Sequence, residues 1–159
     1  MKKHLAALLV AGLVYCAPTL AQTPKSPLLG EWVLDVESMP FPPEARPKSV
    51  TMTYSDAGDG KWRTIVDVVG RDGHEIRADG TYPLDGTAVP SQGYPTVDTV
   101  ATVVPAPNVM VTALYQKGIP RTTRTYTVAA DGKTMTETVV WLNLNGKPEI
   151  TMSRFNRAD

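Results

Sequence analysis

Cysteine is nearly absent from this sequence. The single cysteine, Cys16, lies within an apolar segment near the N-terminus, and none follows it. A chain that loses this segment has no disulfide, no thiol nucleophile and no thiolate metal site, yet it is long enough to bury an apolar core without them. A lipid anchor on Cys16 is not expected, because the bulky Tyr15 stands where lipoprotein signals have a small residue.

Groups that perform catalysis are also scarce. Beyond the N-terminal segment the only histidine is His74, expected to be exposed at a strand start, whereas a histidine metal site needs two or three such ligands. The sequence has no G-x-S-x-G elbow and no glycine-rich phosphate loop. No spacing brings two carboxylates together as acid and base among Asp67, Asp79, Asp85, Asp98 and Glu137. We therefore expect no catalytic residue, no metal, no cofactor and no enzymatic activity.

An excess of one charge is missing as well. The chain has 16 basic and 16 acidic residues, and they are interspersed along its length without a basic stripe. Binding to nucleic acid or to an anionic membrane would therefore lack an electrostatic driving force. Long apolar runs are absent beyond the N-terminal segment, so no transmembrane segment is expected once that segment is removed.

The N-terminal segment has the three zones of a secretory signal. Met1–His4 is basic, Leu5–Val14 is an apolar run too short to span a membrane, and Thr19–Ala21 is a small-residue cleavage site. These zones predict cleavage after Ala21, which makes residues 1–21 a signal peptide. The protein is therefore expected to be exported, either to a periplasm or out of the cell.

The rest of the chain is punctuated by tight-turn signals. Residues 22–27 are predicted to be a short polar leader, and residues 28–159 a single domain. Asp-Gly and Asn-Gly pairs, which supply the positive φ of tight hairpins, separate runs rich in Val, Thr, Ile, Tyr and Trp. Strands are expected near residues 28–37, 48–55, 61–70, 74–82, 97–104, 108–117, 121–129, 133–144 and 147–156.

Several of these runs alternate between apolar and polar residues, which indicates one face on a core and one in water. The expected fold class is all-β, an antiparallel meander of about eight or nine strands closed as a barrel. A two-sheet sandwich is the alternative. Asp79-Gly80 falls inside a run and predicts a β-bulge, and the proline-rich stretch 39–47 predicts a surface loop.

Short motifs add a resemblance to this reading. Gly30, Glu31 and Trp32 form a G-x-W pattern at the head of the first expected strand, and further pieces are Phe41–Lys48, Val97–Val100, Asp131–Thr136 and Asn145–Pro148. With these motifs the chain resembles exported bacterial proteins of the lipocalin-like (calycin-like) barrel type. The resemblance implies a barrel and export, but no activity. It also implies that Trp32 closes one end of the barrel and that Arg154, in the last strand, packs over its ring as a cation–π partner.

Aromatic residues supply the candidate binding site. A barrel of this size holds either side chains or one small ligand. The residues expected to line such a cavity, or else to fill the core, are Tyr54, Trp62, Tyr82, Tyr115, Tyr126 and Trp141. Lys61, Arg121 and Arg124 are suited either to orienting an anionic ligand or to discouraging edge pairing.

Three functions follow from these features. The first is an exported lipocalin-like protein that binds a small apolar or amphipathic molecule without catalysis. The second is an envelope protein with a filled core, which contacts a protein partner through Met39–Pro47 and Pro90–Pro95. The third is an enzyme such as an isomerase or cyclase working in the cavity, which rests on fold analogy alone.

Overall fold

The computed structural model describes residues 25–158. The predicted signal peptide, its cleavage site after Ala21 and the start of the predicted 22–27 leader lie outside the described residues. The strands are β1 (Gly30–Asp35), β2 (Ser49–Gly58), β3 (Lys61–Val69), β4 (Glu75–Pro83), β5 (Val89–Pro90), β6 (Thr99–Ala106), β7 (Val109–Gln116), β8 (Ile119–Val128), β9 (Thr134–Leu142) and β10 (Pro148–Arg157).

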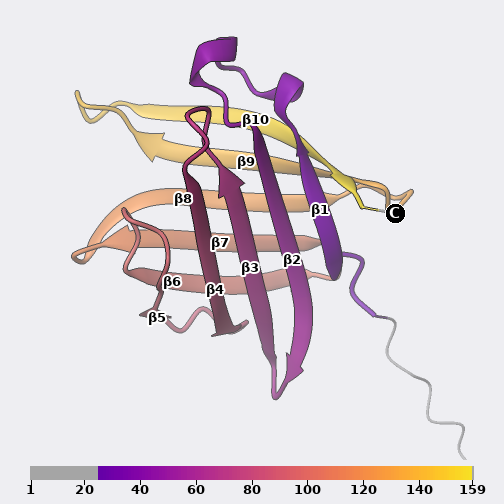
Figure 1. Cartoon of the computed structure of the whole chain (residues 1–159). Helices are drawn as coiled ribbons and strands as arrows, with labels where there is room; N and C mark the ends of the chain where they lie inside the picture. Colours follow the sequence, from indigo (N-terminus) through magenta and orange to yellow (C-terminus); the bar gives the residue numbers. More distant parts are fainter. Residues whose placement is uncertain (1–24, 159) are drawn as a thin grey trace, which may run out of the picture.

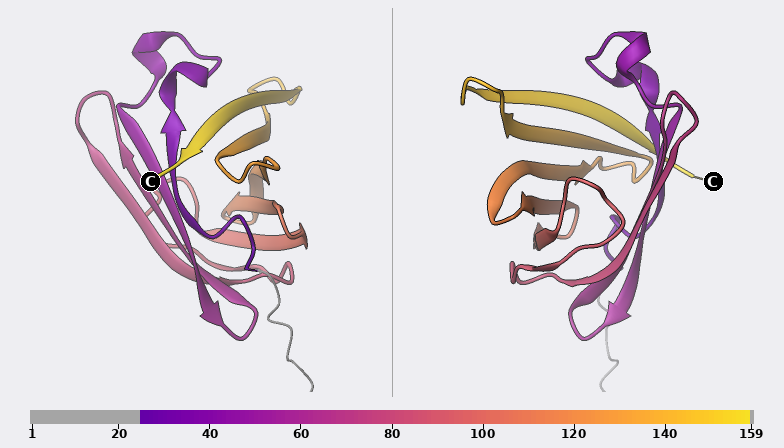
Figure 2. Two further views of the ribbon diagram at one scale, coloured as in Figure 1. Left: turned by 90° about the vertical axis from the view of Figure 1, so that its right-hand side faces the viewer. Right: turned by 60° about the vertical axis from the view of Figure 1, so that its left-hand side comes forward.

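The strands form one antiparallel sheet of ten, in the order β4-β3-β2-β1-β10-β9-β8-β7-β6-β5. This sheet curls until its two edges approach each other, which makes a nearly closed barrel (Figures 1 and 2). The all-β barrel predicted from the sequence is confirmed, and the sandwich alternative is not the fold. Among residues 25–158 there is no helix with the length and apolarity to span a membrane.

Tight turns join most neighbouring strands. Between β2 and β3, Asp59 and Gly60 both have positive φ (51° and 68°), as the predicted Asp-Gly hairpin requires. Lys117 and Gly118 make a similar turn between β7 and β8, with φ of 53° and 74°. The proline-rich loop, residues 39–47, lies between β1 and β2 and includes a short 3-10 turn, η2 (Pro43–Ala45). A second such turn, η1 (Val36–Ser38), directly precedes the loop.

The predicted bulge at Asp79-Gly80 is wrong. Gly80 pairs with Thr64 in the regular register of β3 and β4. Its role is steric, because a methyl group on Gly80 would lie 2.2 Å from the Tyr82 hydroxyl. The glycine thus leaves room for the Tyr82 side chain to fold back along the inner face of its own strand.

One end of the barrel is filled by a tightly packed core. Trp32 is fully buried, and its indole N–H donates a 2.8 Å hydrogen bond to the carbonyl of Leu28. Around it pack other fully or almost fully buried side chains, namely Leu28, Val128, Met135 and Phe155. The predicted burial of Trp32 is therefore confirmed.

The predicted partner of Trp32 is wrong. The guanidinium that covers the indole belongs to Arg157, whose central carbon lies 4.1 Å from the ring centroid. Arg157 also donates hydrogen bonds to the carbonyls of Leu29 (2.9 Å), Gly132 (2.7 Å) and Pro27. Gly30 makes this possible, because a Cβ there would lie 2.7 Å from Arg157 Nη1. The glycine of G-x-W thus leaves space for the cation that covers the tryptophan.

Arg154 faces outward because side chains alternate along β10. Ser153 and Phe155 are buried, so the residue between them points to the other face. There Arg154 pairs across the β1–β10 ladder with Asp35, at 2.5 Å between Nη2 and Oδ2.

Replacing Arg154 should change the titration of Asp35 more than the stability of the barrel. The hydrogen bond from Arg154, together with its positive charge, holds the pKa of Asp35 below its ordinary value. In Arg154→Ala the Asp35 pKa should rise toward the ordinary range, as measured by NMR titration of the side-chain carboxyl. Because a lowered folded-state pKa stabilises the protein above the unfolded pKa, the wild type should lose this contribution as pH falls through the folded value. An unchanged Asp35 pKa would contradict the pairing.

Candidate ligand-binding cavity

The rest of the barrel interior is hollow. A cavity of about 450 Å³ lies between the Trp32 end and the loops at the opposite end, within the size range of sites for small molecules. Its walls are mainly apolar and come from strands all round the barrel, with Leu34, Val50, Met52, Val66, Val100 and Met110 among the lining residues. The interior therefore differs from the filled core that the second functional reading assumed.

Three of the six predicted aromatic residues line this cavity: Tyr54, Tyr82 and Tyr126. Tyr54 and Tyr126 are buried and meet edge to face, with ring centroids 6.3 Å apart. The alternation predicted along β2 is confirmed, because Val50, Met52 and Tyr54 all line the cavity.

The other three predicted aromatic residues lie outside the cavity lining. Trp62 is buried in the core. Tyr115 does not line the cavity, although Leu114, the residue directly before it, does. The register between β7 and β8 shifts between these two residues. Trp141 is partly exposed near the end of β9.

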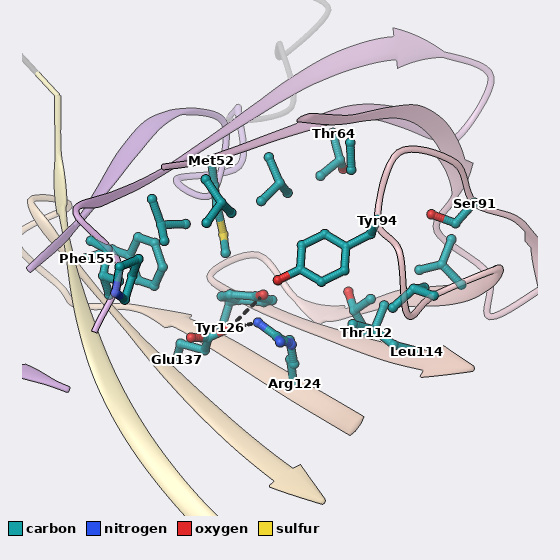
Figure 3. Close-up of a pocket in the computed structure, with 18 of the residues that line it drawn as sticks. Met52, Thr64, Ser91, Tyr94, Thr112, Leu114, Arg124, Tyr126, Glu137 and Phe155 are labelled. Atoms are coloured by element: carbon teal, nitrogen blue, oxygen red, sulfur yellow. Dashed lines mark hydrogen bonds and ion pairs between the residues drawn. The ribbon is translucent and has the colours of Figure 1, made fainter. Parts of the chain in front are cut away.

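A polar cluster lies against the apolar wall, formed by Arg124 and Tyr126 of β8 and Glu137 of β9 (Figure 3). Glu137 is only 6% exposed. Its Oε1 accepts hydrogen bonds from Arg124 Nη1 at 2.8 Å and from the Tyr126 hydroxyl at 3.0 Å. These bonds offset the loss of hydration that both charges suffer inside the barrel.

The two tyrosines beside this ion pair are uncharged hydrogen-bonding groups. Burial raises the pKa of Tyr54 and of Tyr126, and the negative charge of Glu137 raises both further. Their hydroxyls therefore stay protonated across the physiological range. Tyr126 donates its proton to Glu137, and Tyr54 donates its own to the Met52 sulfur at 3.3 Å.

The proline-rich loop covers the end of the cavity opposite Trp32. Met39, Arg46 and Pro47 of this loop, and Arg71 of the β3–β4 turn, are lining residues. Arg71 Nη1 donates a 2.8 Å hydrogen bond to the carbonyl of Pro43, which ties the loop to the turn. The surface loop predicted over residues 39–47 is therefore part of the cavity wall.

A second loop, residues 91–98, crosses the gap between the two edges of the sheet. Its Gly93 packs against β4 so closely that a methyl group there would lie 2.1 Å from the carbonyl oxygen of Arg77. Ser91 Oγ lies 3.3 Å from the Tyr82 hydroxyl of β4. Tyr94 projects from this loop into the cavity, toward Tyr126 and Arg124 (Figure 3).

Apart from Arg124 and Glu137, the charged residues singled out in the sequence do not line the cavity. His74 is exposed, as expected, and so are Lys61 and Arg121. Asp67 and Asp79 lie on the outer face, where they pair with Arg77 and Arg63 at 2.8 and 2.6 Å; Asp85 and Asp98 are also exposed.

Arg124 and Glu137 were not predicted as a pair. Their sequence signal is weak but present: Arg124 lies two residues before the buried Tyr126, and Glu137 two residues after the buried Met135. Each therefore occupies an inward position of its strand. Cross-strand pairing brings them together, because Tyr126 is opposite Glu137 in the β8–β9 register.

Comparison with known proteins identifies the architecture. No protein-family model and no curated protein sequence matches the chain. Solved structures do match: wild-type UnaG, a fluorescent protein, has a TM-score of 0.56 and 13% identity over 82% of this chain and 97% of that one. Two single-residue mutants of UnaG give TM-scores of 0.56 and 0.53, with 13% and 12% identity, over 84% and 82% of this chain. These likenesses show a shared fold, a lipocalin-like β-barrel.

Proposed function

We propose that this protein is an exported binding protein that holds a small apolar or amphipathic molecule inside its barrel and does not act as a catalyst. The observation that carries the proposal is the cavity, with apolar walls and one polar cluster, which suits a ligand of mixed polarity. The calycin-type fold supports the same reading. Export is supported by the basic, apolar and small-residue zones of residues 1–21.

The lining favours binding over cavity catalysis. Glu137 is the one carboxylate among the described lining residues, and no histidine lines the cavity in that part of the chain. Its Oε1 is engaged by Arg124 and Tyr126. A general acid–base mechanism needs a group free to exchange a proton with the substrate, and this carboxylate is instead held in an ion pair.

The two segments considered for protein contacts, residues 39–47 and 90–95, have another use. Both contribute side chains to the cavity. Their apolar and aromatic groups are therefore better suited to closing over a ligand than to forming an external interface.

Filling the cavity should abolish binding of an apolar probe. Ala78 lines the cavity from β4, and Ala78→Trp would place a large ring in the space that a ligand needs. The purified protein should bind Nile red, an uncharged fluorescent probe, with micromolar affinity, and Ala78→Trp should weaken that binding by about a hundredfold or more.

The matched control is Ala113→Trp. Ala113 lies between Thr112 and Leu114, which both line the cavity, and is therefore on the outer face of β7. This variant should bind Nile red like the wild type. Equal binding by all three proteins, or no binding by the wild type, would overturn the proposed function.

A further inference from the structure

The charges of the inner polar cluster already balance. The inner wall carries one cation, Arg124, and one anion, Glu137, joined at 2.8 Å. The other charged lining residues in the described part of the chain, Arg46 and Arg71, belong to the proline-rich loop and the β3–β4 turn. A ligand that reaches the inner cluster therefore meets a neutral pair instead of an uncompensated positive charge.

The unused hydrogen-bonding capacity of the cluster lies mainly with Arg124. A guanidinium has five N–H donors. Nη1 bonds to Glu137 and Nε lies 3.5 Å from the Thr122 hydroxyl, so these two contacts leave part of the donor set unused. Because Arg124 is a lining residue, these remaining donors are available to an acceptor in the cavity (Figure 3).

We infer that the ligand's inner polar group is uncharged and accepts a hydrogen bond from Arg124, as the carbonyl oxygen of an amide does. This inference rests on the proposed function and specifies its ligand. A carbonyl uses the free donors and adds no net charge. A carboxylate would also accept these bonds, but it would be repelled by Glu137 and would lose its hydration in an apolar cavity without a counter-ion of its own.

Matched ligands can test this chemistry. Dodecanamide and dodecanoate share one hydrocarbon tail and differ only in the head group, and each can compete with Nile red for the purified protein. At about pH 8, where a carboxylic acid is ionised, dodecanamide should displace the probe at a concentration at least about tenfold lower than dodecanoate.

Substituting Glu137 tests the cause of this preference. Glu137→Gln keeps the shape of the side chain and removes its charge, which leaves Arg124 as a free cation. The preference should then fall by about tenfold or more, or reverse in favour of dodecanoate. Glu31→Gln is the matched control, because Glu31 is an exposed glutamate of β1 and its loss should leave the preference unchanged.

The outcomes separate the two proposals. If the wild type does not bind Nile red, the proposed function fails and this inference fails with it. If the wild type binds Nile red and neither compound displaces it, this inference alone fails. If both compounds displace Nile red from the wild type and dodecanoate does so as well as dodecanamide or better, the inferred uncharged head group is wrong and the proposed function stands. This comparison uses only the wild type, so it does not depend on whether a variant folds. If the wild type prefers the amide and a folded Glu137→Gln does so equally, the ion pair is not the cause and the inference is overturned.

Discussion

Trp32→Ala should lower the free energy of unfolding by about 3–5 kcal/mol, the loss typical of a large buried aromatic side chain. The indole is fully buried, its N–H bonds to the Leu28 carbonyl, and its face carries the Arg157 guanidinium. Losses of this size take up much of the stability of a domain with this length. Chemical denaturation followed by circular dichroism measures the change.

Trp141→Ala is the matched control for this substitution. Trp141 is partly exposed near the end of β9, so its removal should destabilise the protein by clearly less than the loss of Trp32. Arg157→Ala, combined with Trp32→Ala in a double-mutant cycle, measures the coupling between cation and ring. A coupling of about 0.5–2 kcal/mol is expected, and a value indistinguishable from zero would contradict the stacking.

Gly93→Ala should detach the 91–98 loop from β4. The φ of Gly93 is 89°, a conformation that an L side chain rarely adopts, and the added methyl group would lie 2.1 Å from the Arg77 carbonyl oxygen and 2.8 Å from the Ala78 Cα. Neither backbone atom can move without disturbing the strand. We expect a loss of stability of about 1–3 kcal/mol, together with Nile red association that is several-fold faster in stopped-flow measurements.

Gly118→Ala separates the two effects. Gly118 has a similar φ of 74°, but a Cβ there would meet no atom within 4 Å. This control therefore shares the backbone strain and lacks the steric clash. It should lose stability modestly and leave the association rate unchanged. Equal association rates in Gly93→Ala and Gly118→Ala would show that the 91–98 loop does not limit access to the cavity.

The barrel could be predicted because its signals are local. Every predicted strand is present, with bounds shifted by a few residues, since Asp-Gly and Asn-Gly turns and period-two alternation depend on neighbouring residues. The additional strand β5 has two residues and pairs only with β6, so it leaves almost no pattern in the sequence.

The site was only partly predictable because it depends on pairing between strands. Tyr54 and Tyr126 could be selected as aromatic residues in strands. The Arg124–Glu137 ion pair could not, because it requires the register between β8 and β9. The prediction that Arg154 covers Trp32 failed for a similar reason. Arg154 and Arg157 lie on opposite faces of β10, and only the buried positions of that strand show which face is inward.

The pairing of β1 with β10 has a consequence for how the protein folds. Trp32 lies directly opposite Arg157 in that ladder, so the barrel is closed by residues that are far apart in the sequence. Contacts of such long range require a large loss of chain entropy before they contribute stability, and proteins rich in them fold slowly. The hairpins from β2 to β4 and from β6 to β10 can form from local contacts, whereas closure must await synthesis of the last strand. Until then the edges of β1 and β9 that β10 will join remain unpaired and open to association with other chains.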